Sequence, residues 1–416
     1  MRIASTVAIG LGLAGSVLAQ GENGSAARNR VERELVALAA KTMRFGPGES
    51  PVAVEKTEEY ERIRGVDGHL EALHEVADAL FSDNQDLRVV ALEVIATIGD
   101  KSSVYKVLLI LNDSNEVPNV RVKAIEVAVR FGDPRAVIPL VEIIALPETE
   151  EKVGESGRTF YRWSDVKRRA ADAIARFPGE SVAIDRLVRY LTEEIATPST
   201  VENAAYCLGL LKAESAVPDL RRLLRSTNLP PAVKREVLIA LGRIGAEGAL
   251  GEIASALHDP DSTVQMEAVN ALGYLGPAAA SEAGKLAGIL SDESADLYVR
   301  ASIPGALVKI APDSKEVSEA LVALLGKKVE GLPEWEDPNL LHVAAMAALQ
   351  FAAPARAIPL LVGRLGDADE NIVSTATGLL KRLAKSFFEE KNRPFPKSKE
   401  EWKTWWENDG QSYYRQ

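Results

Sequence analysis

The segment 231–276 contains one pattern of apolar and polar positions twice. The two copies begin at Val233 and Val264, which lie 31 positions apart. In each copy, apolar residues stand four, seven and eight positions after the first valine, a spacing that places all four on one stripe of a helix. Periods of about 20–50 residues are typical of stacked helical arrays. The pattern therefore predicts two amphipathic helices in successive units of an array.

The same pattern recurs along most of the chain. Nine residues begin a helix of this kind, and we call them the anchors: Leu87, Val120, Val166, Thr200, Val233, Val264, Val299, Leu341 and Ile372. The residue four positions after an anchor is small or aliphatic, as Ala268 is after Val264, so we expect neighbouring helices to pack closely. Glycines follow four of these first helices and predict left-handed helix ends; they are Gly99, Gly132, Gly245 and Gly276.

A second helix, antiparallel to the first, is predicted between successive anchors. Three of these second helices carry a proline, at Pro139, Pro218 and Pro359. We expect each proline in the first turn, because a missing amide hydrogen costs little there. An aspartate-rich turn, such as 258–261, then leads to the next anchor. These helix pairs predict an all-α fold, and we expect the second helices to form its concave side.

Helix pairs with an aspartate between units and a Val-Arg opening resemble HEAT repeats, in particular the short bilin-lyase-like type. The residues that carry the resemblance are Val120-Arg121-Val122-Lys123-Ala124, Val299-Arg300 and the Ala-Leu-Gly runs. The resemblance covers 86–385 and the nine anchors within it. It implies a HEAT-repeat α-solenoid, a right-handed superhelix of antiparallel helix pairs. It concerns packing rather than chemistry, so it implies a fold more than a function.

Two insertions interrupt the regular spacing. The step from Val120 to Val166 is 46 positions and that from Val299 to Leu341 is 42, whereas the other steps run from 31 to 35. The extra residues lie in 146–163 and 326–339, at the same point of the repeat, so they should project from one edge. Their arginine and aromatic residues are candidates for protein binding: Arg158, Phe160, Tyr161, Arg162, Trp163 and Trp335. Alternatively, the first loop folds back on its own repeat.

The two ends of the chain depart from the repeat. Residues 1–19 have a basic start, an apolar run and a small-residue cleavage site, which predicts a signal peptide and export to a periplasm or the medium. Residues 20–85 are expected to form a leader and an atypical first helical unit. Residues 386–416 are rich in aromatic residues, with Trp402, Trp405 and Trp406 on one face of a helix expected from Lys399 onward. We interpret this tail as a cap on the last repeat, with a ligand platform as the alternative.

The composition narrows the range of partners. Among 416 residues, 49 are basic and 60 acidic, giving a formal charge of −11. An acidic chain is unsuited to a nucleic-acid partner, which needs clustered lysine and arginine. No segment after the signal peptide is apolar enough to span a membrane. The single cysteine, Cys207, lies in an apolar run and is expected to be a buried small residue.

Candidate chemistry is sparse. The four histidines have no spacing that suits a metal site, and the chain contains no glycine-rich phosphate loop, nucleophile elbow or CxxC motif. The HEAT-repeat family includes deoxyhypusine hydroxylase, whose di-iron site needs several His-Glu pairs, but only His74-Glu75 matches. We therefore expect no catalytic residue, no cofactor and no metal.

Two hypotheses about function remain. The first is an exported, non-catalytic scaffold that binds a protein or peptide on its concave helical face and inserted loops. The second is an enzyme or enzyme subunit, lyase-like or hydrolytic, with a site between the loops and the concave face. The nearest polar candidates for that site are Glu150, Glu151, Arg158 and Arg162.

Overall fold

The chain forms two compact units of paired helices, residues 1–183 and 184–416, and each is described by itself. The computed structural model describes residues 31, 33–39, 57–64, 76–99, 101–147, 162–177, 180–193, 196–226, 228–330 and 337–414. Within these ranges the regular structure is helical and includes no strand. The predicted signal peptide and most of the predicted leader lie outside these ranges.

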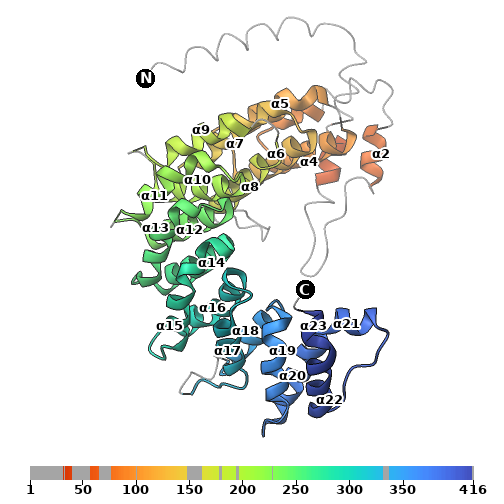
Figure 1. Ribbon diagram of the computed structural model, residues 1–416. Helices are drawn as coiled ribbons and strands as arrows, with labels where there is room; N and C mark the ends of the chain where they lie inside the picture. The colour runs from red at the N-terminus through yellow and green to blue at the C-terminus, as the bar shows by residue number, and fades with distance from the viewer. Residues whose placement is uncertain are drawn as a thin grey trace, which may run out of the picture. The chain divides into compact units, whose positions relative to one another are not determined.

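The helices of the first unit follow each other in pairs (Figure 1). Their bounds are α2 Glu58–Arg64, α4 Gln85–Ile98, α5 Val104–Asn112, α6 Pro118–Phe131, α7 Val137–Ala145 and α8 Trp163–Ile174, and α9 Glu180–Tyr190 crosses the boundary between the units.

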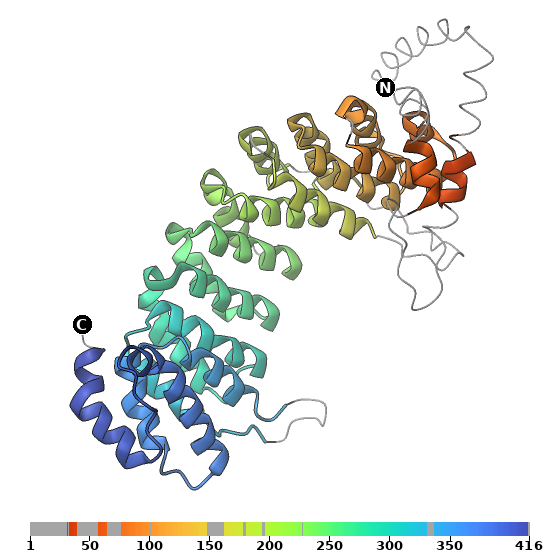
Figure 2. The ribbon, with the colours of Figure 1, turned by 90° about the vertical axis from the view of Figure 1, so that its right-hand side faces the viewer.

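The second unit continues the pairing, and Figure 2 shows its helices stacked from green to blue. Their bounds are α10 Pro198–Leu210, α11 Val217–Leu224, α12 Pro231–Ile244, α13 Leu250–Ser255, α14 Ser262–Leu275, α15 Ala283–Ser291, α16 Leu297–Ile310, α17 Lys315–Ala323, α18 Leu340–Leu349, α19 Pro354–Arg364, α20 Glu370–Leu383, α21 Lys385–Glu390, α22 Lys399–Trp405 and α23 Gln411–Tyr413. A single π-turn, Trp406–Gly410, joins the last two.

The predicted anchors lie at the starts of the first helices and are part of the core. All nine lie within the first four residues of the even-numbered helices from α4 to α20, and all are buried. The apolar stripe predicted from Val264 holds, because Ala268, Ala271 and Leu272 are also buried. The pattern of first and second helices is therefore confirmed along the described repeats.

Small residues bring the first helices of the second unit close together. A Cβ atom added to Gly209 would lie 2.8 Å from the Cα atom of Ala240, and one added to Gly273 would lie 3.2 Å from the Cα atom of Ala306. Up to α18 the second helices of this unit contact one another much less, whereas α17 and α19 pack more extensively than α18 and α20 do. From α10 to α18 the stack is therefore tightest along its first helices, and Figure 1 shows α12, α14 and α16 on the inner side of this unit. The prediction that second helices form the concave side is wrong for this unit.

Two local predictions also need correction. Gly99, Gly132 and Gly245 take the left-handed conformation, but Gly276 combines φ 57° with ψ −135°. Gly276 differs because it leads directly into a 3-10 segment, Gly276–Glu282, instead of a separate turn. Pro359 lies inside α19 and not in its first turn, because the helix already begins at Pro354.

The C-terminal segment folds onto the last helix pair. Helix α22 packs against α19, and the hydroxyl group of Tyr414 donates a hydrogen bond to the carbonyl oxygen of Leu383 at 3.0 Å. Trp402 and Trp405 are only 1% and 3% exposed, so their rings are core side chains. This placement fits the interpretation of the tail as a cap.

Replacing Ser398 by alanine is expected to destabilise α22 by about 1 kcal/mol. Ser398 is the N-cap of this helix, and its hydroxyl oxygen accepts a hydrogen bond from the Glu401 amide at 3.1 Å. Loss of an N-cap side chain typically costs about that much. Faster amide hydrogen exchange in 399–405 would show the effect, whereas Ser398→Asp should retain the wild-type rate, since aspartate also caps helices well. Equal exchange in the alanine and aspartate variants would contradict the assignment.

Candidate functional site

The residues predicted to bind a partner are only partly described. Arg158, Phe160, Tyr161 and Trp335 lie outside the described residues, so their role stays a prediction. Arg162 is exposed at the start of α8, and its backbone amide donates to the Asp165 carboxylate at 2.9 Å. Trp163 is 8% exposed, and the guanidinium carbon of Arg121 lies 5.5 Å from its ring centroid. Trp163 therefore fixes the end of the first inserted loop to α6.

Arg121 belongs to a group of buried charges in the first unit. Its guanidinium donates to the backbone carbonyls of Leu111, Asp113 and Glu116. Burial lowers its pKa, while the charges of Glu116 and Asp113 oppose that shift. Arg121 thus connects α6 to the end of α5 and to the turn that follows α5.

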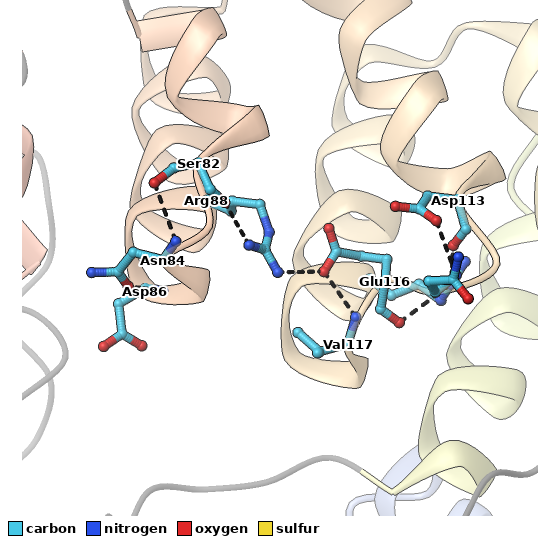
Figure 3. Close-up of polar contacts among 9 residues, drawn as sticks. Ser82, Asn84, Asp86, Arg88, Asp113, Glu116 and Val117 are labelled. Atoms are coloured by element: carbon cyan, nitrogen blue, oxygen red, sulfur yellow. Dashed lines mark hydrogen bonds and ion pairs between the residues drawn. The ribbon is translucent and has the colours of Figure 1, made fainter. Parts of the chain in front are cut away.

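A second buried pair lies beside it (Figure 3). Arg88 and the carboxylate of Glu116 are 2.8 Å apart, and Glu116 also accepts the Val117 amide hydrogen at 2.8 Å. Arg88 further donates to the carbonyl oxygen of Ser82 at 2.6 Å. Because these hydrogen bonds link α4 to the start of α6, we interpret the whole cluster as structural.

The second inserted loop is closed at its base. The Val329 amide donates to the carbonyl oxygen of Pro338 at 2.9 Å, and the Gly326 amide donates to Nδ1 of His342 at 3.0 Å. His342 lies in α18, one position after an anchor. The loop thus enters the fold at a fixed place and leads directly into α18.

The first helices of the second unit carry a row of exposed aromatic and basic side chains. The residue ten positions after each of the five anchors from Val233 to Ile372 points away from the core, and we call these residues the outer row, in which Arg243 is half-buried: Arg243, Tyr274, Lys309, Phe351 and Arg382. Tyr274 is 56% and Phe351 71% exposed. Cationic and aromatic residues alternate from one repeat to the next along this row.

The outer row is held in place by contacts between neighbouring repeats. The Lys309 ammonium lies 5.2 Å from the ring centroid of Tyr274, and the guanidinium carbon of Arg243 lies 5.1 Å from that of Tyr206 in α10. The Tyr274 ring also lies across α12, since a Cβ atom on Gly242 would come within 3.1 Å of it. The row is therefore a preorganised surface rather than a set of free side chains.

An apolar groove adjoins the row between α16 and α18. Its volume is about 670 Å³, within the range of about 300–1,000 Å³ typical of ligand pockets. Lys309 and Phe351 belong to its rim. The remaining lining is apolar apart from one serine: Ala301, Ser302, Gly305, Val308, Pro312, Ala344, Ala347 and Ala348.

The first helices of the first unit have a different surface. Lys123 on α6 forms ion pairs with Glu93 on α4 and with Glu126, at 2.7 Å and 2.8 Å. Arg169 on α8 extends this ladder to Glu126 at 3.3 Å. Charges that satisfy one another in this way offer little to a partner, so we place the candidate site on the first helices of the second unit.

The described residues offer no arrangement suited to metal-dependent chemistry. They contain no group of three or more His, Cys, Asp or Glu side chains that could hold an ion. Cys207 is buried, as expected. Glu150 and Glu151, the acidic candidates of the enzyme hypothesis, lie outside the described residues. Within the same limits, no helix combines the length and apolar character that crossing a bilayer requires.

Comparison with known proteins agrees with the fold. The family model for HEAT repeats matches residues 70–152 and 227–303. The resemblance to HEAT repeats is thus confirmed for these two stretches, and the described residues have the all-α fold of stacked helix pairs that it implies.

Among curated proteins, deoxyhypusine hydroxylase of Danio rerio is 36% identical over 75 residues, which are 18% of this chain and 25% of that protein. The match thus spans only a quarter of that relative's length.

Two solved structures illustrate the structural similarity. Kap95p, solved with RanGDP, aligns with a TM-score of 0.59 at 13% identity, over 89% of this chain and 56% of that one. The complex of CpcE and CpcF of phycocyanin lyase from Nostoc sp. PCC7120 aligns with a TM-score of 0.33 at 20% identity, over 75% of this chain and 94% of that one. The similarity to Kap95p concerns the fold alone.

Proposed function

We propose that this protein is an exported, non-catalytic scaffold that binds a protein or peptide through the first helices of its second unit. The observation that carries the proposal is the outer row with its adjoining groove. Aromatic residues and arginine are the residues that most often dominate binding energy at interfaces. A stack of repeats holds them on a rigid support, which lowers the entropy lost on binding.

Several further features support the proposal. The fold is one on which extended binding surfaces are common. Kap95p, with which this chain shares the fold, is described in complex with another protein, RanGDP. The apolar start of the chain favours export. The second inserted loop leads into α18, one wall of the groove, so its residues are placed to contribute to the same interface.

Truncating two aromatic residues of the outer row tests the proposal. A Tyr274→Ala, Phe351→Ala double variant should bind the partner at least about tenfold more weakly, because truncating an interface anchor typically costs more than about 1 kcal/mol. The partner would be obtained by crosslinking the mature protein, from Gln20 onward, in an extract of its own envelope fraction. Affinity would then be measured with the purified partner.

A matched control uses exposed apolar residues elsewhere. Tyr105 and Ile138 are 61% and 43% exposed on the second helices α5 and α7. The Tyr105→Ala, Ile138→Ala variant should leave the affinity unchanged within about twofold, since surface substitutions away from an interface have small effects. Weakening by the control variant alone would refute the assignment of the binding surface.

A further inference from the structure

We propose that the groove between α16 and α18 receives an apolar side chain from an acidic peptide segment, whose carboxylates bind Lys309 and Arg243. This inference rests on the proposed function and names the class of partner. It follows from the apolar lining of the groove, from the lack of carboxylate partners at Lys309 and Arg243 among the described residues, and from the distance between these two cations.

The groove is suited to an apolar side chain. Gly305, which lines the groove, faces open space, with no atom within 4 Å of an added Cβ. The hydroxyl group of Ser302 donates to the carbonyl oxygen of Val299 at 2.7 Å, so this polar group is already satisfied within its helix. Phe351, 71% exposed at the rim, can cover an inserted side chain. Burying an apolar group here removes apolar surface of both molecules from water.

The two cations favour an acidic partner. Lys309 is the one charged residue among those that line the groove, and its contact within the described residues is the Tyr274 ring rather than a carboxylate. Arg243 likewise lies over the Tyr206 ring and forms no ion pair with a described residue. Carboxylates would satisfy both cations with charge-assisted hydrogen bonds.

The spacing of the cations sets the spacing of the acids. Arg243 on α12 and Lys309 on α16 occupy the outer row two repeats apart. Packed helices lie about 8–10 Å apart, so the two side chains are roughly 16–20 Å apart along the row. An extended peptide advances about 3.3 Å per residue, so two acidic residues should be about five or six positions apart. The groove lies between α16 and α18, on the side of Lys309 away from Arg243. The apolar residue of the peptide should therefore lie one or two positions beyond the acidic residue that binds Lys309.

Peptide selection tests this pattern directly. A phage-displayed library of random dodecamers would be selected on the full-length chain, and the enriched peptides synthesised with a fluorophore for titration. We expect enriched peptides with two acidic residues five or six positions apart and an apolar residue beyond one of them. Their affinity should fall with rising salt, since rim charges are screened.

Two substitutions of the same kind locate the binding. Gly305→Met fills the groove without a clash and should weaken binding at least about tenfold. Gly288→Met is the matched control, because Gly288 also faces open space but lies on the second helix α15, and it should leave binding unchanged. When the library is selected on the Lys309→Glu variant, the peptide residue that binds at position 309 should be basic instead of acidic.

The outcomes separate this inference from the proposed function. Enriched peptides without acidic residues, or binding unaffected by Gly305→Met, would overturn the inference. If such peptides still lost affinity in the Tyr274→Ala, Phe351→Ala variant, the proposed function would stand. Self-association of the chain that Gly305→Met abolishes would assign the groove to a second copy and refute the peptide. If no peptide is enriched and the double variant retains its partner, both are refuted.

Discussion

Replacing Trp402 by alanine is expected to destabilise the C-terminal end of the second unit by about 3–5 kcal/mol, the usual cost of truncating a buried tryptophan. Trp402 is 1% exposed and lies in a cluster of rings, with centroid distances of 5.4 Å to Trp405 and 5.8 Å to Phe388. Removing it leaves a cavity in the ring cluster between α21 and α22, and α22 in turn packs against α19. Amide hydrogen exchange in 354–405 should accelerate, and the exposed apolar end of the stack should promote aggregation.

Trp406→Ala provides the matched control. Trp406 is only partly buried and stacks at 6.5 Å on Tyr414 at the edge of the cluster. Its loss should therefore cost clearly less, and exchange in α19 should hardly change. Equal effects of the two substitutions, or a soluble Trp402→Ala protein with wild-type exchange, would refute the interpretation of the tail as a cap.

Replacing Gly209 by alanine is expected to destabilise the second unit by about 1–3 kcal/mol, the typical cost of overpacking. The added methyl group would lie 2.8 Å from the Cα atom of Ala240, which belongs to the backbone of α12 and cannot rotate away. Helices α10 and α12 must therefore separate. Since each repeat packs only on its neighbours, hydrogen exchange should rise first in 198–244.

The same substitution at Gly288 should act in the opposite direction. Gly288 lies in α15 with nothing within 4 Å of an added Cβ. Alanine there should stabilise the helix by roughly 0.5–1 kcal/mol, because glycine loses more backbone entropy in a helix. If Gly209→Ala and Gly288→Ala change hydrogen exchange in the same direction, the close contact between α10 and α12 does not cause the destabilisation.

The sequence predicts the repeat framework well because that framework depends on local spacing. An anchor such as Val264 is buried because its helix places residues four, seven and eight positions on along the same stripe. The N-cap at Ser398 likewise depends only on its own side chain and on Glu401 three positions later. These features depend on residues within two turns of one another.

The candidate site was not predictable in the same way. The groove exists only because α16 and α18 leave space between Gly305 and Ala347, which depends on the distance between two helices. Lys309 and Tyr274 belong to different repeats, and the contact between them follows from the packing of α14 against α16. One signal is present in the sequence: cations and aromatic residues alternate ten positions after the last five anchors, from Val233 to Ile372.

The orientation of the stack was also missed for a physical reason. The sequence shows which helices carry glycine and alanine, but not how closely each row packs. Gly242 lies within 3.1 Å of Ala271 once a Cβ atom is added, and that contact shows that the first helices form the tight side. A glycine recurring at the same position of successive first helices was the available clue.

Site-specific photo-crosslinking tests the central claim most directly. A benzophenone amino acid would replace Phe351 on the outer row in one variant and Arg222, exposed on the second helix α11, in another. After irradiation with the purified partner, we expect an adduct at position 351 and none at 222, and Lys309→Glu should reduce the first. An adduct at 222 without one at 351 would contradict the account, because it would place the partner on the second helices.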